Sequence, residues 1–198
     1  MATADQSASS QQPSPLQNRR LLLGVSGSIA AYKAAPLVRL LVQAGAEVQV
    51  ILTEAAAAFV TPLTLGTLSK KPVLTGFLRD AASGQWHNHV ELGLWADAYV
   101  IAPASANTLG QLANGLCPNL LSAVYLSARC PVFLAPAMDL DMYAHPAVTQ
   151  NIARLRSFGN HVFDSPSGAL ASGLSGPGRM LEPEQIVAEL ATFFSQPS

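Results

Sequence analysis

Short runs of consecutive apolar residues alternate along the chain with longer segments in which apolar residues recur every three or four positions. The short runs are typical of strands buried on both faces, and the longer segments of helices that cover a sheet. This alternation predicts a single-domain α/β fold, with a Rossmann-like open parallel sheet of about six strands and helices on both faces. The expected strands span residues 21–25, 48–52, 73–74, 98–102, 132–135 and 161–163.

Two segments show helical spacing clearly. The first covers residues 29–43, where Pro36 is expected to kink or shorten the helix and Gly45 to end it. The second covers residues 183–194 and predicts a closing amphipathic helix. Residues 98–128 contain no Asp, Glu, Lys or Arg, so part of that segment is expected in the interior or at an interface.

One stretch near the end of the chain has few large apolar residues that could pack into a core. Residues 165–180 read SPSGALASGLSGPGRM and are rich in Gly and Ser, with Arg179 near the end. Such a composition is typical of a loop whose backbone is free to move. We therefore expect a mobile flap over a site.

Composition narrows the class of protein. The chain has 198 residues, of which 49% are hydrophobic and 12% charged, and its net charge is -1. Its Lys and Arg residues are not clustered, so the sequence predicts no basic surface for binding nucleic acid or an anionic membrane. No apolar run is long enough to span a bilayer. Because so few residues are charged, we expect apolar surface to be buried between copies in a homo-oligomer.

The first 18 residues are mostly Ser, Gln, Ala and Pro and lack the features of a signal peptide. They predict a disordered tail, followed by one domain over residues 19–195. Cys117 and Cys130 are expected to be free thiols in a reducing compartment. Cytoplasmic localisation is the expectation.

The first strand runs into Gly24-Val25-Ser26-Gly27-Ser28-Ile29, a turn of small residues that opens a helix. Such a turn can bind a phosphate group, because its backbone N–H groups are free and the helix dipole favours negative charge. It could also be a tight turn without a ligand. The spacing does not match GxGxxG, a Walker loop or a GxSxG nucleophile elbow. A dinucleotide fold is therefore disfavoured but stays open.

Polar side chains follow two other strands at the same edge of the sheet. Thr53 could donate to the same phosphate or cap the next helix, and Glu54 would be the acidic partner of an NAD ribose. Residues 105–108, Ser-Ala-Asn-Thr, suit the polar edge of a flat heterocycle. Ser105 could instead be an ordinary helix cap.

Several motifs occur together in order: GVSGSIAAYK at 24–33, HVELGLWAD at 89–97, PASANT at 103–108, PAM with a further Met at 136–142, and a Gly-rich segment ending in GRM at 172–180. With these motifs the chain resembles the flavin-containing cysteine decarboxylases over about residues 19–194. Within that family it is most similar to phosphopantothenoylcysteine decarboxylases. In many bacteria these form the amino-terminal half of a fusion with phosphopantothenate-cysteine ligase.

The resemblance implies FMN bound without a covalent link and a homotrimer, or a dodecamer of trimers, with the flavin at a subunit boundary. It also assigns residues to the two ligands. The implied FMN contacts are Gly27, Ser28, Ile29 and Thr53 at the phosphate, Ser105, Ala106, Asn107 and Thr108 at the ring, and Ala137. The implied substrate contacts are Asp139, Met142, Ala169, Leu170, Ala171 and Arg179.

The implied reaction converts 4'-phosphopantothenoylcysteine to 4'-phosphopantetheine in coenzyme A biosynthesis. Oxidation at the carbon that bears sulfur, with FMN as hydride acceptor, creates a C=S group that accepts the electrons of the departing carboxylate. His89 matches the family's catalytic histidine, as the base or as the positioning group for thiol or carboxylate. His87 lies outside the motif, and a metal site on the two histidines would lack a third ligand at any recognisable spacing.

Two departures from the family pattern fall at positions to which the resemblance assigns a part in the reaction. Asp139 stands where the motif has Asn, and must be protonated, paired with a cation such as Arg179, or turned away from a substrate carboxylate. Ser172 stands where the flap has its proton-donating Cys, and a hydroxyl is a far weaker acid than a thiol with a pKa of about 8.5. Tyr143 replaces a Trp and keeps an aromatic wall.

These departures leave three functions open. They are the full redox-neutral cycle, an oxidative peptidyl-cysteine decarboxylase that releases an ene-thiol, and a flavoprotein subunit without catalysis. For the first we hypothesise that Cys117 supplies the missing acid, although a buried structural role is the simpler explanation. Cys130 is a weaker candidate, because it precedes the fifth strand at the opposite edge.

Overall fold

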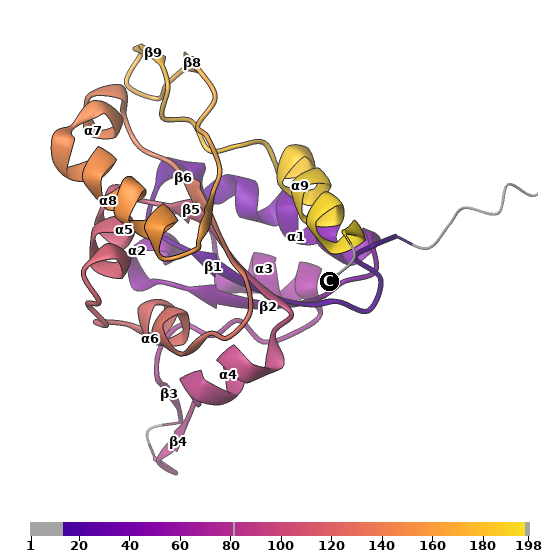
Figure 1. Cartoon of the computed structure of the whole chain (residues 1–198). Coiled ribbons are helices and arrows are strands. Elements are labelled where there is room, and N and C mark those ends of the chain that lie inside the picture. The colour runs from indigo at the N-terminus through magenta and orange to yellow at the C-terminus, as the bar shows by residue number, and fades with distance from the viewer. Residues whose placement is uncertain (1–13, 81, 197–198) are drawn as a thin grey trace, which may run out of the picture.

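A five-stranded parallel sheet with strand order β2-β1-β5-β6-β7 forms the centre of the computed structural model, which describes residues 14–80 and 82–196 (Figure 1). The prediction of an open parallel α/β sheet in one domain is confirmed. The sheet strands are β1 (Arg20–Val25), β2 (Glu47–Leu52), β5 (Ala98–Ala104), β6 (Val132–Pro136) and β7 (His161–Val162). The helices are η1 (Ile29–Lys33, 3-10), α1 (Ala34–Gln43), α2 (Glu54–Ala57), α3 (Pro62–Ser69), α4 (His89–Trp95), α5 (Ala106–Ala113), α6 (Leu120–Ser127), α7 (Leu140–Ala144), α8 (Pro146–Ser157) and α9 (Pro183–Ser195).

Helices cover both faces of the sheet because successive strand side chains point to opposite sides. In β1, Leu21 and Leu23 pack into a core with α1, α3 and α9, whereas Leu22 packs into a second core with α5, α6 and α8. Helix α4 joins the second layer through its contact with α6. Both faces are thereby buried, which explains why the strands read as continuous apolar runs.

The expected helix over residues 29–43 divides in two. Residues of η1 form a 3-10 turn and α1 begins at Ala34, so Pro36 falls in the first turn of α1, where its missing N–H costs no helical hydrogen bond. Gly45 has a φ of +87° and lies just beyond the helix end. The predicted shortening at Pro36 and stop at Gly45 are confirmed, as is the closing helix, which is α9.

The expected strand at residues 73–74 is reduced to a single bridge. Leu74 pairs with Ile51 at the edge of the sheet, and its amide and carbonyl bond to Val50 and Leu52. Pro72 lacks a donor on one side, and Thr75-Gly76 lead the chain away on the other. The chain then forms a small hairpin that the sequence did not predict, with β3 (Leu78–Asp80) and β4 (Gln85–Trp86).

The segment without charges is largely interior. Every residue of β5 is buried, and α5 and α6 each turn a buried apolar face to the second core. Exposed apolar residues remain at its loop and outer face, among them Leu116 and Leu126. The interior part of that expectation is confirmed.

The tail expected over residues 1–18 lies partly within the described structure. Residues 1–13 lie outside the described part of the chain, but residues 14–18 form a turn that packs on the domain. Leu16 is fully buried in the core beneath α1 and α9. Residues 14–18 are therefore ordered, because one apolar side chain in a polar segment is enough to anchor them. The division of the chain at residue 18 stays a prediction.

The Gly- and Ser-rich stretch, residues 165–180, is called the flap below. It contains a second small hairpin, with β8 (Gly168–Ala169) and β9 (Ser175–Gly176), and rises beyond the sheet beside α7 (Figure 1). Within residues 14–80 and 82–196, no helix has the length and apolar character needed to cross a membrane.

Candidate active site

Three loops meet at the carboxyl edge of the sheet, and each opens a helix with a hydroxyl side chain. Ser28 Oγ accepts from the Ala30 amide at 3.3 Å. Thr53 Oγ1 accepts from the Ala56 amide at 3.2 Å, and Ser105 Oγ from the Thr108 amide at 3.3 Å. The capping roles left open by the sequence are therefore present, and they hold the three hydroxyl groups in place at the edge where α/β folds bind ligands.

A cavity of about 520 Å³ lies between these loops. Its volume is in the range of small-molecule sites, and its lining mixes backbone, hydroxyl, amide and apolar groups. The lining residues are Gly27, Ser28, Thr53, Glu54, Ala55, Ser105, Ala106, Asn107, Thr108, Gln111, Pro118, Asn119, Ala137, Met138 and Met142. The structure thus brings together all the predicted FMN contacts except Ile29, which lines the adjoining cavity described below.

The first loop is shaped for a small charged group. A Cβ on Gly27 would lie 2.6 Å from the Cβ of Ala55, so only glycine allows the loop to pass this close to α2. Within the described structure the amides of residues 27–29 have no acceptor, whereas those of Ala30 and Ala31 bond to Ser28. Three unpaired amides beside a glycine fit the phosphate of a nucleotide such as FMN.

Ser26 is a buried residue that the sequence analysis did not assign. Its Oγ donates to the Pro103 carbonyl at 2.7 Å and accepts from the Ser105 amide at 2.9 Å. It therefore ties the start of the loop after β1 to the end of β5 and to the residue that follows it. The available signal was a hydroxyl directly after an apolar strand, since a buried hydroxyl needs partners.

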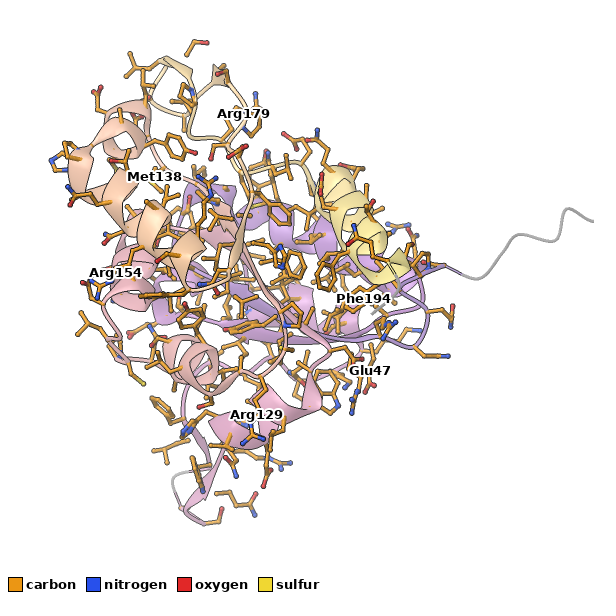
Figure 2. All side chains as sticks on the ribbon, in the orientation of Figure 1. Glu47, Arg129, Met138, Arg154, Arg179 and Phe194 are labelled. Atoms are coloured by element: carbon orange, nitrogen blue, oxygen red, sulfur yellow. The ribbon has the colours of Figure 1, made fainter. Side chains whose placement is uncertain are left out.

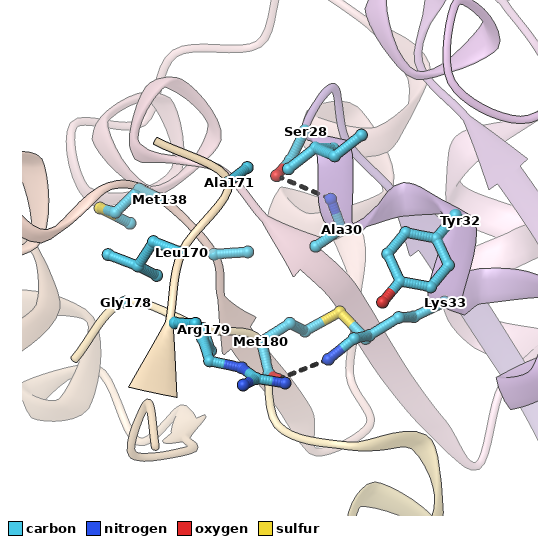
Figure 3. A pocket seen from close by; sticks show the side chains of 13 residues that line it. Ser28, Ala30, Tyr32, Lys33, Met138, Leu170, Ala171, Gly178, Arg179 and Met180 are labelled. Atoms are coloured by element: carbon cyan, nitrogen blue, oxygen red, sulfur yellow. Dashed lines mark hydrogen bonds between the residues drawn. The ribbon is translucent and has the colours of Figure 1, made fainter. Parts of the chain in front are cut away.

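A second cavity, of about 240 Å³, lies beneath the flap (Figure 3). It shares Ser28, Ala137 and Met138 with the first, so the two adjoin at these residues. Figure 2 places Met138 and Arg179 in the same part of the molecule. The remaining lining residues are Ile29, Ala30, Tyr32, Lys33, Ala169, Leu170, Ala171, Gly178, Arg179 and Met180.

Most predicted substrate contacts line one of the two cavities. Ala169, Leu170, Ala171 and Arg179 line the second cavity, and Met142 lines the first. Asp139 precedes α7 and lines neither, and no ion pair joins it to Arg179, which pairs with Glu182 instead. Tyr32, Lys33 and Met138 were missed as candidates, although the first two belong to the GVSGSIAAYK motif.

The two candidate proton donors lie at different places. Ser172 is exposed in the turn of the flap hairpin, where its Oγ accepts from the Leu174 amide at 3.4 Å. Cys117 is exposed between α5 and α6, next to Pro118, which lines the first cavity. Cys130 precedes β6 at the amino edge, where burial is the main cause that raises the pKa of its thiol.

His89 is not brought to these cavities within one chain. It begins α4, which lies with β3 and β4 at the end of the molecule away from the flap hairpin (Figure 1). The rings of Trp86 and Phe77 lie 5.8 Å and 6.4 Å from its ring, and its buried Nδ1 has no hydrogen-bond partner in the described structure. The role predicted for His89 therefore remains a prediction.

His87 lies in a separate hollow with Arg79 and Trp86. Burial, and then the positive charge of Arg79, lower the pKa of His87. In the described part of the chain, no three His, Cys, Asp or Glu side chains are grouped as a metal ion would require.

A parallel α/β sheet whose carboxyl edge holds a cavity fitted to a nucleotide phosphate and a flat ring defines a nucleotide-cofactor protein. The chain belongs to the Flavoprotein family, whose sequence profile matches residues 9–195. The predicted family is thereby confirmed.

Among similar proteins, the Cysteine/Cysteine sulfinic acid decarboxylase of an unknown prokaryotic organism is 59% identical over 137 residues, which are 69% of this chain and 38% of that protein. The coenzyme A biosynthesis bifunctional protein CoaBC of Bacillus subtilis (strain 168) is 45% identical over 181 residues, 91% of this chain and 44% of that protein. The chain thus spans less than half the length of these relatives.

Two solved structures share the fold along nearly their whole length. A Cys-to-Ser mutant of PPC decarboxylase, complexed with pantothenoylaminoethenethiol, has a TM-score of 0.81 and 34% identity, and the match covers 91% of this chain and 100% of that one. The FMN-dependent cysteine decarboxylase SpaF has a TM-score of 0.76 and 28% identity, covering 91% and 99%.

Proposed function

We propose that the first cavity binds FMN. The unpaired amides of residues 27–29 and the Thr53 hydroxyl would hold the phosphate, and residues 105–108 with Ala137 would contact the ring system. The assignment also accounts for the glycine at position 27, which the loop needs in order to pass close to Ala55. Bound FMN would supply a hydride acceptor that no amino-acid side chain can replace.

We propose further that the chain decarboxylates 4'-phosphopantothenoylcysteine to 4'-phosphopantetheine, a step of coenzyme A biosynthesis, in the cytoplasm. The observation that carries this proposal is the second cavity, which adjoins the first at Ser28, Ala137 and Met138 and is roofed by the flap. A substrate lying there would reach the flavin cavity with one end, while the flap excludes water from the reacting carbon. CoaBC relatives support this substrate and a ligase domain or partner that supplies it.

His89 would take part from a neighbouring copy of the chain. It lines neither cavity in its own chain, and its surroundings expose apolar side chains, with Trp86 52%, Val90 45% and Leu94 51% exposed. A homo-oligomer, a trimer or a dodecamer of trimers, would bury these groups and bring the imidazole to the neighbour's flavin cavity. There His89 would accept a proton from the substrate thiol or orient its carboxylate.

Ser172 favours a second candidate function, oxidative decarboxylation with release of an ene-thiol. The hydroxyl is exposed and is a poor proton donor compared with a thiol. The similar PPC decarboxylase structure is a Cys-to-Ser mutant that holds pantothenoylaminoethenethiol, itself an ene-thiol. In this second candidate the reduced flavin would need an external oxidant such as O2. A flavoprotein subunit without catalysis is the third possibility.

One assay separates these functions. The purified chain is incubated with 4'-phosphopantothenoylcysteine, with and without O2, and the products are identified by mass. The proposal expects CO2 and 4'-phosphopantetheine under both conditions. A product lighter by two hydrogen atoms would favour the ene-thiol function, and unchanged substrate would favour a non-catalytic role. Free cysteine and cysteine sulfinic acid are tested in parallel because of the 59%-identical relative, and turnover of these alone would reject the proposed substrate.

A further inference from the structure

Three charged side chains meet where the flap returns to the domain. Lys33 Nζ donates to Glu182 Oε1 at 2.7 Å, and Arg179 donates to the same oxygen at 3.1 Å. Lys33 Nζ also donates to the carbonyl oxygen of Met180 at 3.3 Å (Figure 3). One carboxylate therefore joins η1, the end of the flap and the start of α9.

Lys33 depends on this arrangement because its side chain is only 8% exposed. A buried ammonium group is costly unless it is paired and hydrogen-bonded. Among the described residues, Glu182 provides its only ion pair and the Met180 carbonyl its other acceptor. Both partners belong to the segment that closes the flap, so Lys33 ties that segment to η1, which lines the second cavity.

Arg179 in turn supports the wall of the second cavity. A Cβ on Gly168 would lie 2.7 Å from Arg179 Nη1, so β8 rests directly on the guanidinium. Residues 169–171 follow immediately and line that cavity. On the other side, Gly178 has a φ of +131°, and its carbonyl accepts from the Met138 amide at 2.9 Å. A shift of Arg179 would therefore be passed to the residues that would contact substrate.

We propose that Glu182 is a positioning residue, which holds Lys33 and Arg179 together so that the substrate wall of residues 169–171 is formed before substrate arrives. The inference rests on the proposed function only in treating the second cavity as the substrate site. With the carboxylate removed, Arg179 loses its ion-pair partner and the flap opens more often. Substrate must then order the flap on binding, which raises KM more than it lowers kcat.

The bond between Arg179 and Met180 reports flap opening directly. Trypsin cleaves after Arg, but Met180 is 1% exposed, so cleavage requires local opening of the segment. The product to follow is the peptide 180–198, which contains no further Lys or Arg. This measurement needs neither substrate nor turnover.

The test compares wild-type protein, Glu182→Gln, Glu182→Asp and Glu184→Gln, all with bound FMN. Glu184 is the matched control, because it lies exposed in the first turn of the same helix with no ion pair among the described contacts. Glu182→Gln is expected to release the peptide 180–198 about five- to tenfold faster than wild type, with KM raised by a similar factor. Glu182→Asp should recover most of the protection, and Glu184→Gln should match wild type.

Two results overturn the inference. The first is an unchanged cleavage rate in Glu182→Gln, and the second is faster cleavage with an unchanged KM in an active enzyme. Thermal unfolding of each variant serves as the reference, because Glu182→Gln is also expected to lower Tm. A cleavage rate that rises no more than this loss of global stability accounts for counts as unchanged local opening. If the wild-type chain does not decarboxylate any substrate offered, the proposed function fails, and the cleavage rates alone then decide whether Glu182 holds the flap.

Discussion

His87 and His89 are two residues apart, yet their surroundings differ. His89 contacts the rings of Phe77 and Trp86, and its buried Nδ1 has no partner among the described residues, whereas His87 lines a separate hollow with Arg79. A buried ring nitrogen without a partner is costly in an isolated chain. A second copy that covers this region would remove that cost.

His89→Asn should therefore keep FMN and lower CO2 release by about 10²- to 10⁴-fold, the usual contribution of one acid–base group. His87→Asn serves as the control and should keep most of the activity. Product formation and flavin content are measured on the same samples. Equal losses in both variants, or recovery on adding zinc, would argue against the assigned role.

A second prediction concerns the proton donor, because Ser172 stands where the family has a Cys in the flap. If Cys117 supplies the acid, Cys117→Ala should still release CO2 but give the product lighter by two hydrogen atoms, because the final protonation fails. Ser172→Cys in that background should restore the reduced product. Mass analysis of the product is the measurement. Normal formation of 4'-phosphopantetheine by Cys117→Ala would reject Cys117 and leave Ser172, Asp139 or a water molecule as the donor.

At the scale of elements, the start of α9 depends on the charge of Glu182. The hydrogen bond from Lys33 is the main cause that lowers the pKa of Glu182, with further contributions from the charges of Lys33 and Arg179. A carboxyl group with a lowered folded-state pKa stabilises the fold above its ordinary pKa. That contribution is lost as the pH falls through the lowered value.

The difference in Tm between wild type and Glu182→Gln should thus be largest near neutral pH. It should begin to shrink below the ordinary Glu pKa of about 4.3 and vanish only below the lowered pKa, where the folded wild-type carboxyl group also becomes neutral. Thermal unfolding followed from pH 7 to pH 3 measures it, with Glu184→Gln as control. A difference that stays constant over this range would show that the charge of Glu182 does not contribute.

The elements that sequence patterns could predict are those with a strong local signal. Buried apolar runs gave four of the strands nearly at their observed bounds, and Pro36 and Gly45 gave the division and end of the first helix. The strand at residues 73–74 shrank to a bridge because the three residues between Pro72 and Gly76 are too few for a longer ladder. The hairpin of β3 and β4 has no apolar alternation to reveal it, and Leu16 is a single anchor in a polar segment.

The residues of the candidate site also divide into those with a local sequence signal and those without one. That residues 27–28, Thr53 and residues 105–108 line one cavity could be predicted, because parallel strands bring their carboxyl ends to one edge. Their roles toward a ligand stay predictions. Lys33 and Glu182 could not be predicted, since their importance lies in contacts between segments far apart in the sequence. For Ser26 the sequence offered a signal, its place after an apolar strand, but not the partners of its hydroxyl. The position of His89 relative to the cavities could not be predicted either, because it depends on how the whole chain folds.

At the scale of the molecule, a site shared between copies predicts that two different variants of low activity can restore each other's activity in a mixed oligomer. Asn107→Ala should lack FMN, since Asn107 lines the first cavity, and His89→Asn should keep it. Each variant alone should have little activity, Asn107→Ala because it lacks FMN and His89→Asn because CO2 release falls by about 10²- to 10⁴-fold. After dissociation and random reassembly of an equal mixture, about a quarter of the sites would combine an intact cavity with an intact His89. Activity in the mixture confirms that sites are shared, whereas an inactive mixture of verified hetero-oligomers contradicts it.

The most direct measurement is the identity of the cofactor in the purified wild-type chain. The protein is denatured, and the released compound is identified by its mass and absorption spectrum and counted against the chain. FMN released at about one molecule per chain is the predicted result, since each chain carries one such cavity at the sheet edge among its described residues. A colourless protein that takes up NAD but not FMN would contradict it.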